Sequence, residues 1–192
     1  MVTLADLATD AGACARCPLA AGRTTVVFGG GDPAADLMFV GEAPGRDEDL
    51  QGEPFVGRSG QLLDRLLAEE LGLDRSRVYI ANTVMCRPPG NRDPRPEEIA
   101  ACRPFLDAKI ELIGPRVIVT LGNFATRLLL GTDAGIRSLR GRAYPFGTSV
   151  VVPTYHPSFV LRAGSAGEPM AGMRADFVRA KEHLALPAGA GR

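Results

Sequence analysis

Four cysteines are the residues whose type and spacing most directly suggest chemistry. Cys14 and Cys17 form a C-x2-C pair, a spacing that lets two thiolates point at one metal centre from a tight turn. Cys86 and Cys102 lie far along the chain, with 15 residues between them. Four thiolates without a nearby histidine suit either a structural zinc or an iron–sulfur cluster. Two unrelated sets of buried thiols are the alternative, and a thioredoxin-like redox pair is disfavoured because no strand precedes Cys14.

Polar side chains beside short apolar segments form a second group of candidates. Asn82 and His156 each follow an apolar segment, and an amide or an imidazole placed there can hydrogen-bond a ligand. Glu42 and Glu48 are carboxylates that could orient water or stabilise positive charge. Each has a simpler explanation, since an isolated asparagine is usually a turn residue and Glu48 lies in an acidic run typical of a solvated surface.

A glycine-rich segment surrounds these carboxylates. Residues 41–45 (GEAPG) and 55–60 (FVGRSG) contain small residues such as Gly41 and Ala43, which let backbone amides approach a ligand closely. The segment is not a Walker loop, because the chain lacks the required Gly-Lys-Ser or Gly-Lys-Thr. The three glycines at 29–31 are predicted to form a turn.

The elements that would position these residues alternate between strand and helix. Apolar runs predict strands at 37–40, 78–81, 117–121 and 150–152, the last ending before Pro153. Apolar spacings of three and four predict helices at 60–71, 96–113, 122–130 and 171–184. This order predicts a three-layer α/β/α fold with a mostly parallel four-stranded central sheet. Ligands of such folds bind beyond the carboxyl ends of the strands, where segments 41–60, 82–95 and 154–162 lie.

Length and composition are those of a soluble globular protein. The chain has 192 residues, 45% of them hydrophobic, and a net charge of zero. We expect one domain over residues 1–186 and a disordered tail at 187–192. No stretch is long and apolar enough to cross a bilayer, so we expect a cytoplasmic monomer without a membrane partner. Of its 22 basic residues 20 are arginines, which suit bidentate phosphate contacts.

Several of these motifs together match a known family. The loop at 41–60, Asn82 and the segments 86–92 (CRPPGNR), 102–106 (CRPFL) and 156–158 (HPS) closely resemble the family 4 uracil-DNA glycosylases. The match extends from about Cys14 to about Arg162, with the separated motifs in the right order. The resemblance implies a small α/β/α fold and a [4Fe–4S] cluster on the four cysteines. It also implies an enzyme of DNA repair that hydrolyses the N-glycosidic bond of uracil in DNA and leaves an abasic site.

The resemblance also implies how a uracil base would be held. The base must leave the duplex before its bond can be reached, and Phe55 would stack on it. Asn82 would accept from uracil N3–H and donate to O4, a pattern that cytosine inverts. Gly41 and Ala43 would line the base pocket. His156 would donate to O2, where negative charge accumulates as the bond breaks.

Water activation is the step at which this sequence departs from the best-known glycosylase family. Ala43 stands where the best-known glycosylase family has an aspartate thought to act on the water. Glu42 and Glu48 are therefore both candidate catalytic residues. Asn91 is expected to hold Glu48 in place.

Contact with DNA must depend on local charge, because the net charge is zero. Arg137, Arg140 and Arg142 form a basic stretch, and Arg162 follows the histidine motif. These arginines are expected to contact DNA phosphates. The apolar run at 159–161 is a candidate wedge that fills the vacated stack, unless it only packs a short helix.

Two other classes of protein fit parts of the sequence. A noncatalytic, cluster-bearing DNA-binding or polymerase-associated module could share the fold, but it would not need Phe55, Asn82 and His156 together. A zinc-bound redox or nucleotide-binding protein is disfavoured because the chain lacks a cofactor fingerprint.

Overall fold

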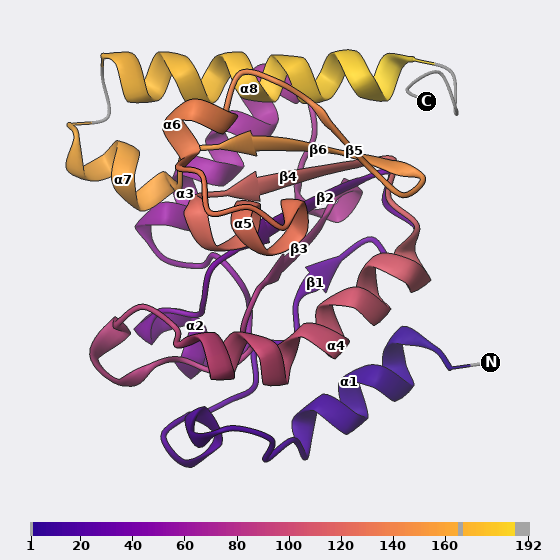
Figure 1. The fold of residues 1–192 in the computed structure, drawn as a ribbon, viewed down its shortest axis with the longest axis vertical. Helices are drawn as coiled ribbons and strands as arrows, with labels where there is room; N and C mark the ends of the chain where they lie inside the picture. Colours follow the sequence, from indigo (N-terminus) through magenta and orange to yellow (C-terminus); the bar gives the residue numbers. More distant parts are fainter. Residues whose placement is uncertain (1, 165–166, 187–192) are drawn as a thin grey trace.

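The computed structural model describes residues 2–164 and 167–186, built around one sheet with strand order β1-β3-β2-β4-β6-β5 (Figure 1). The strands are β1 (Gly30–Gly31), β2 (Leu37–Gly41), β3 (Tyr79–Asn82), β4 (Val117–Leu121), β5 (Tyr144–Phe146) and β6 (Ser149–Thr154). The inner strands β3, β2, β4 and β6 are parallel, whereas β1 and β5 pair antiparallel at the edges. The expected α/β class is confirmed, but the expected count of four strands was wrong.

The two edge strands escaped prediction because they are too short to show a period. β1 is two residues of the glycine run predicted as a turn, and β5 has three residues. The last strand was also expected to end before Pro153, but β6 continues through it to Thr154. Proline has no N–H to donate, and pairing with β5 has already stopped at Val151, so no ladder bond is lost on that side.

All four predicted helices are present; the helix at 96–113 has the predicted bounds, and the other three differ at one or both ends. The helices are α1 (Leu4–Gly12), α2 (Arg46–Gln51), α3 (Arg58–Leu66), α4 (Pro96–Ile113), α5 (Asn123–Leu130), α6 (Ile136–Leu139), α7 (Pro157–Arg162) and α8 (Glu168–Ala185). A π-helical turn at Leu67–Leu71 extends α3 to Gly72, whose φ of 67° ends the helix. The short helices α2, α6 and α7 and the N-terminal α1 were not predicted.

Helices cover both faces of the sheet, because alternate residues of the buried strands point to opposite sides. One face packs on leucines of α3 and on Met173 and Phe177 of α8. The other face packs on α4 and α5 through Leu106 and Leu129. In Figure 1, α8 lies along one side of the sheet and α4 on the other. The expected three-layer arrangement is therefore present.

A third apolar cluster joins the N-terminal segment to the chain after β3. Helix α1 packs against α4, and Figure 1 shows the two side by side. Ala11 and Leu19 from the N-terminal part meet Val84, Met85 and Phe105. All four cysteines belong to this cluster or pack against it.

No helix of the described residues is long and apolar enough to cross a membrane. The tail expected at 187–192 lies outside the described residues.

Candidate active site

A cavity of about 370 Å³ opens at the carboxyl ends of the parallel strands. Residues Gly41 of β2 and Asn82 of β3 are directly paired in the sheet, which fixes the loops that follow them side by side. The cavity brings together eight residues singled out from the sequence: Glu42, Ala43, Glu48, Phe55, Asn82, Asn91, His156 and Arg162. Its position agrees with the rule that ligands of parallel α/β sheets bind at this edge.

The Phe55 ring packs tightly against the end of β2. A Cβ on Gly41 would lie 2.6 Å from the ring and 2.5 Å from Oδ1 of Asn82, so only glycine fits here. Phe55 itself has a φ of 55°, a left-handed conformation that is unfavourable for a bulky residue. Arg75 stabilises it by donating to the carbonyl oxygen of Phe55 and, over 2.9 Å, to that of Pro54. The strained backbone therefore serves to present the ring to the cavity.

Asn82 has a buried acceptor without a partner. Its side chain lines the cavity, the residue is 3% exposed, and Oδ1 makes no hydrogen bond to any described residue. Leaving such a group unsatisfied costs about 1–3 kcal/mol. The orphaned oxygen is thus ready to accept from a ligand donor that enters the cavity.

His156 lines the same cavity and lies between β6 and α7. Its ring centroid is 5.9 Å from that of Phe55. The backbone N–H of Ser158 donates to Nδ1 over 3.1 Å. Because Nδ1 is an acceptor, the neutral ring carries its proton on Nε2. Burial, helped by Arg162, lowers the pKa of His156 to about 4, so the imidazole is neutral at physiological pH.

Glu42 has the environment of a carboxyl group poised to gain or lose a proton. Its pKa is raised to about 7, mainly by burial and also by the Asp93 carboxylate, while Arg162 opposes the shift. Such a pKa lies near the operating pH, which is the condition for efficient proton transfer. Glu42 therefore has the properties of an acid–base group.

Glu48 is used differently. Its carboxylate accepts from the backbone N–H groups of Gly45, Val56 and Gly57 over 3.0–3.1 Å, and so clamps together the two halves of the glycine-rich loop. Asn91 was expected to hold this carboxylate. Within the described part of the chain it is not among the hydrogen-bond partners of Glu48, and its Oδ1 instead accepts from Arg87 Nε over 2.6 Å.

An ion pair shapes the loop after β3. Glu98, which is fully buried, accepts from Arg92 through both carboxylate oxygens, at 2.9 and 2.6 Å, and from the backbone N–H of Arg95. Arg92 and Asp93 consequently line the cavity, although neither was singled out from the sequence. An arginine six residues before a glutamate is too common a pattern to have indicated this pair.

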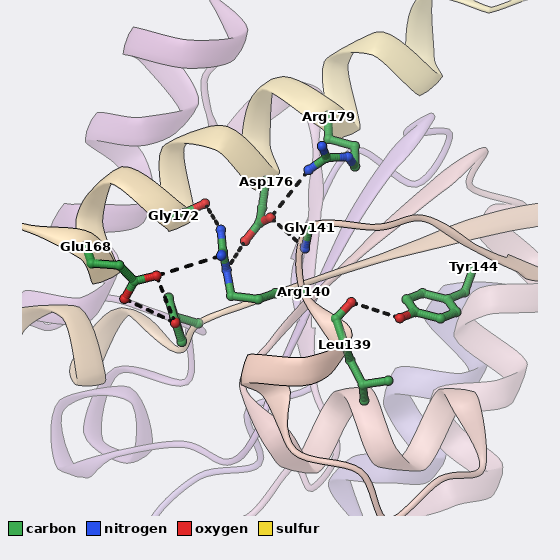
Figure 2. Close-up of polar contacts among 9 residues, drawn as sticks. Leu139, Arg140, Gly141, Tyr144, Glu168, Gly172, Asp176 and Arg179 are labelled. Carbon is green, nitrogen blue, oxygen red and sulfur yellow. Dashed lines mark hydrogen bonds and ion pairs between the residues drawn. The ribbon is translucent and has the colours of Figure 1, made fainter.

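Figure 2 shows that Arg140 points toward Asp176 and Gly172 of α8, where its guanidinium makes contacts inside the protein. Its guanidinium donates to Asp176 Oδ2 over 2.9 Å and to the carbonyl oxygen of Gly172 on α8. It also lies over the ring of Tyr155, the neighbour of His156, at 5.0 Å. The buried Asp176 carboxylate needs this cation. Arg140 was expected to contact DNA, but its donors are used inside the protein.

The other arginines expected to contact DNA are exposed, whereas part of the candidate wedge is buried. Arg137, Arg142 and Arg162 are exposed, and Arg162 lies at the rim of the cavity. In the candidate wedge Val160 is fully buried, whereas Phe159 packs on Tyr155 with ring centroids 5.1 Å apart. Val160 therefore packs the short helix α7 and is not available as a wedge.

The four cysteines gather at the third apolar cluster. All are free thiols; Cys86 and Cys102 are buried, and Cys14 and Cys17 are partly exposed. Burial raises the pKa of Cys86, and the Cys17 and Cys14 thiols are near enough to raise it further. Arg23 donates to Cys86 Sγ over 3.5 Å, which favours a thiolate there. No three His, Cys, Asp or Glu side chains of the described residues lie close enough to hold one metal ion.

Four free thiols are a donor set that suits either a structural zinc or an iron–sulfur cluster.

Comparison with known proteins defines the family. A family model described as the uracil DNA glycosylase superfamily matches residues 28–184. The chain belongs to the uracil-DNA glycosylase superfamily.

Individual relatives narrow this placement to one group. The chain is 44% identical over 169 residues to a type-4 uracil-DNA glycosylase of Sulfurisphaera tokodaii, covering 84% of this chain and 77% of that protein. It is 50% identical over 151 residues to the type-4 protein of Thermotoga maritima, covering 78% of each. A type-5 protein of Pyrobaculum aerophilum is 32% identical over 179 residues, covering 76% of this chain and 78% of that protein. The higher identity to type-4 proteins confirms the family indicated by the sequence motifs.

Proposed function

We propose that the protein removes uracil from DNA by hydrolysing its N-glycosidic bond and leaves an abasic site. The observation that carries the proposal is the buried, unpaired Oδ1 of Asn82 in a cavity that also holds an aromatic ring and a neutral histidine. A base flipped out of the helix would fill this cavity. A binding module would not need such a costly unpaired acceptor.

Recognition of the base would rest on Phe55 and Asn82. The Phe55 ring would stack on uracil, whose N3–H would then donate to the orphaned Oδ1 while the amide NH2 donates to O4. Cytosine lacks the N3–H and presents a donor in place of O4, so the same amide would reject it. Gly41 permits this packing, and Ala43 and Asn91 would border the base.

Departure of the base would depend on His156. As the C1′–N1 bond breaks, its electron pair leaves with uracil and charge grows on O2. With Nδ1 occupied by Ser158, the Nε2–H of the neutral ring would donate to O2. A fixed donor of this kind stabilises the transition state more than the bound substrate.

Glu42 is the preferred residue for water activation. A carboxylate there would orient the water whose oxygen forms the new bond to C1′, accept its proton and balance positive charge on the sugar. Glu48 was the other candidate, but its oxygens hold three backbone N–H groups. We assign Glu48 to shaping the loop.

We propose that Cys14, Cys17, Cys86 and Cys102 hold a [4Fe–4S] cluster with a structural role. Such a cluster would tie the N-terminal segment to the chain after β3, as the third apolar cluster already does. Arg137, Arg142 and Arg162 would contact phosphates of uracil-containing DNA. We expect a monomer that works in the cytoplasm at the nucleoid.

Incubation with a uracil-containing oligonucleotide, followed by alkaline cleavage of abasic sites, tests this function. Strand cleavage only at the uracil position is the expected result, with a cytosine oligonucleotide as the control. Binding of the oligonucleotide without any abasic product would instead identify a noncatalytic module.

A further inference from the structure

A second cavity, of about 390 Å³, adjoins the proposed base pocket. Glu42, His156, Ser158 and Arg162 line both cavities and so form the boundary between them. If the base occupies the first cavity, the groups that act on its glycosidic bond stand at this boundary. The sugar must therefore lie there, and one of the two strand directions from the sugar leads into the second cavity.

The lining of the second cavity suits a nucleotide. Its volume is within the range of small-molecule sites. Phe124, Ile136 and Phe159 provide apolar surface, and Arg137 and Arg162 are exposed cations at the same place. Aromatic faces stack on bases of any sequence, and arginines neutralise the phosphates that connect them.

Phe124 is the residue whose position most needs an explanation. It is only half-buried, although it lies in the first turn of α5, and it belongs to none of the three apolar clusters formed by the described residues. Its neighbour Asn123 accepts from the backbone N–H of Ile136 over 2.8 Å, which joins α5 to the opposite wall. Gly122, with a φ of 92°, allows the closest approach, since a Cβ there would lie 3.1 Å from His156 Cβ. The cavity thus has a wall held by backbone contacts, and that wall carries an aromatic ring that lies outside the three apolar clusters.

We infer that this second cavity is a subsite for the nucleotide next to the flipped uridine, with Phe124 stacking on its base and Arg137 contacting the connecting phosphate. The inference rests on the proposed function. It adds to that function the binding of one neighbouring nucleotide, whose base stacks on the protein. Because stacking is indifferent to base identity, the subsite requires a base without selecting its sequence.

Binding of short single-stranded oligonucleotides tests the subsite. Each of three fluorescent oligonucleotides carries one 2′-fluoro-2′-deoxyuridine, whose N-glycosidic bond resists hydrolysis: an intact strand, and strands with a tetrahydrofuran abasic residue on the 5′ or the 3′ side. We expect the wild-type protein to bind one of the abasic strands roughly 5- to 150-fold more weakly than the intact strand, as measured by anisotropy. Phe124→Ala should bind intact and abasic strands within about twofold of each other, and Phe124→Tyr should restore the difference.

Two controls make the result decisive. Phe146→Ala removes another half-buried ring, in β5, and should keep the wild-type ratio. A plot of the logarithm of the binding constant against the logarithm of the salt concentration has a negative slope. Arg137→Gln should reduce the magnitude of this slope by about 0.7, the value of one single-strand phosphate contact. A wild-type protein indifferent to both missing bases, or a Phe124→Ala variant that keeps the ratio, overturns the subsite. Uracil release is scored separately on a matching strand with ordinary deoxyuridine, so failure of the glycosylase activity is distinguishable from failure of the subsite.

Discussion

Nδ1 of His156 accepts a hydrogen bond from the backbone N–H of Ser158, two residues further along the chain. This contact fixes the ring at the start of α7, where His156 also acts as the N-cap. It leaves Nε2 as the only ring nitrogen that can donate from the neutral imidazole.

The first prediction concerns this donor. His156→Ala should slow single-turnover uracil excision at saturating enzyme by about 10²- to 10³-fold, because an interaction made mainly in the transition state is lost. Binding of uracil DNA, measured by anisotropy, should weaken far less. Equal losses in binding and in rate would mean that His156 only holds the DNA.

Glu42 should set the pH dependence of the reaction. If its carboxylate orients the water, the excision rate should rise with pH and level off above about pH 7, the pKa to which burial raises this group. His156 should not contribute, because its pKa of about 4 keeps it neutral throughout. Glu42→Gln should be slow and pH-independent over pH 5.5–8.5, a range of about three units. A wild-type profile equally flat would contradict this role.

Glu42 should also affect stability in the opposite sense to a salt-bridged carboxylate. A folded-state pKa raised above the unfolded value favours folding at low pH, and this contribution is lost as pH rises from 4.5 through about 7. Glu42→Gln should therefore be more stable than wild type above pH 7, by on the order of 1 kcal/mol. Urea unfolding at pH 5 and pH 8 measures the difference.

Asn82→Ala should separate recognition from folding. Excision of uracil should fall by several orders of magnitude, because each lost partner on the base edge costs about 1–3 kcal/mol. The thermal unfolding midpoint of the variant should stay close to that of the wild type, since Oδ1 makes no hydrogen bond within the described protein. Near-normal turnover would remove Asn82 from the pocket.

Cys86→Ala tests the cluster. Protein purified without oxygen should be brown and contain four irons per chain, and the variant should lose iron, colour and much of its thermal stability. Iron and zinc analysis of both proteins provides the measurement. One zinc and no iron in the wild-type protein would refute the assignment.

Arg140→Gln distinguishes a brace from a DNA contact. Loss of the guanidinium beside Tyr155 should loosen the adjoining His156 and slow single-turnover excision roughly 10- to 100-fold. The salt dependence of DNA binding should stay unchanged, because no phosphate contact is lost. Arg179→Gln, which removes a cation 3.7 Å from the same Asp176 carboxylate, should keep the wild-type rate. A weaker salt dependence of DNA binding for Arg140→Gln would mean that Arg140 does contact a DNA phosphate.

The inner sheet and the grouping of polar residues at its carboxyl edge could be predicted from the sequence, because both depend on local signals. Apolar runs marked four strands, and parallel strands place their following loops at one edge, so Glu42, Asn82 and His156 were expected together. The edge strands were missed because β1 and β5 are stabilised by pairing rather than by a pattern of their own.

The uses of charged side chains were harder to predict. Arg140 stands between two exposed arginines in the chain, and only the distant Asp176 makes it structural. Arg75 and Glu48 support Phe55 through backbone atoms, which carry no residue signature. These contacts join segments far apart in the chain, so tertiary structure alone reveals them.

The packing at Gly41 limits how this pocket can be altered. Any other residue would add atoms where the Phe55 ring and the Asn82 amide already meet. Substitution of Gly41 is therefore not a route to a changed pocket, either in evolution or in protein engineering. A wider substrate range would have to be sought at the rim, where Arg92, Asp93 and Arg162 border the same cavity without supporting its floor.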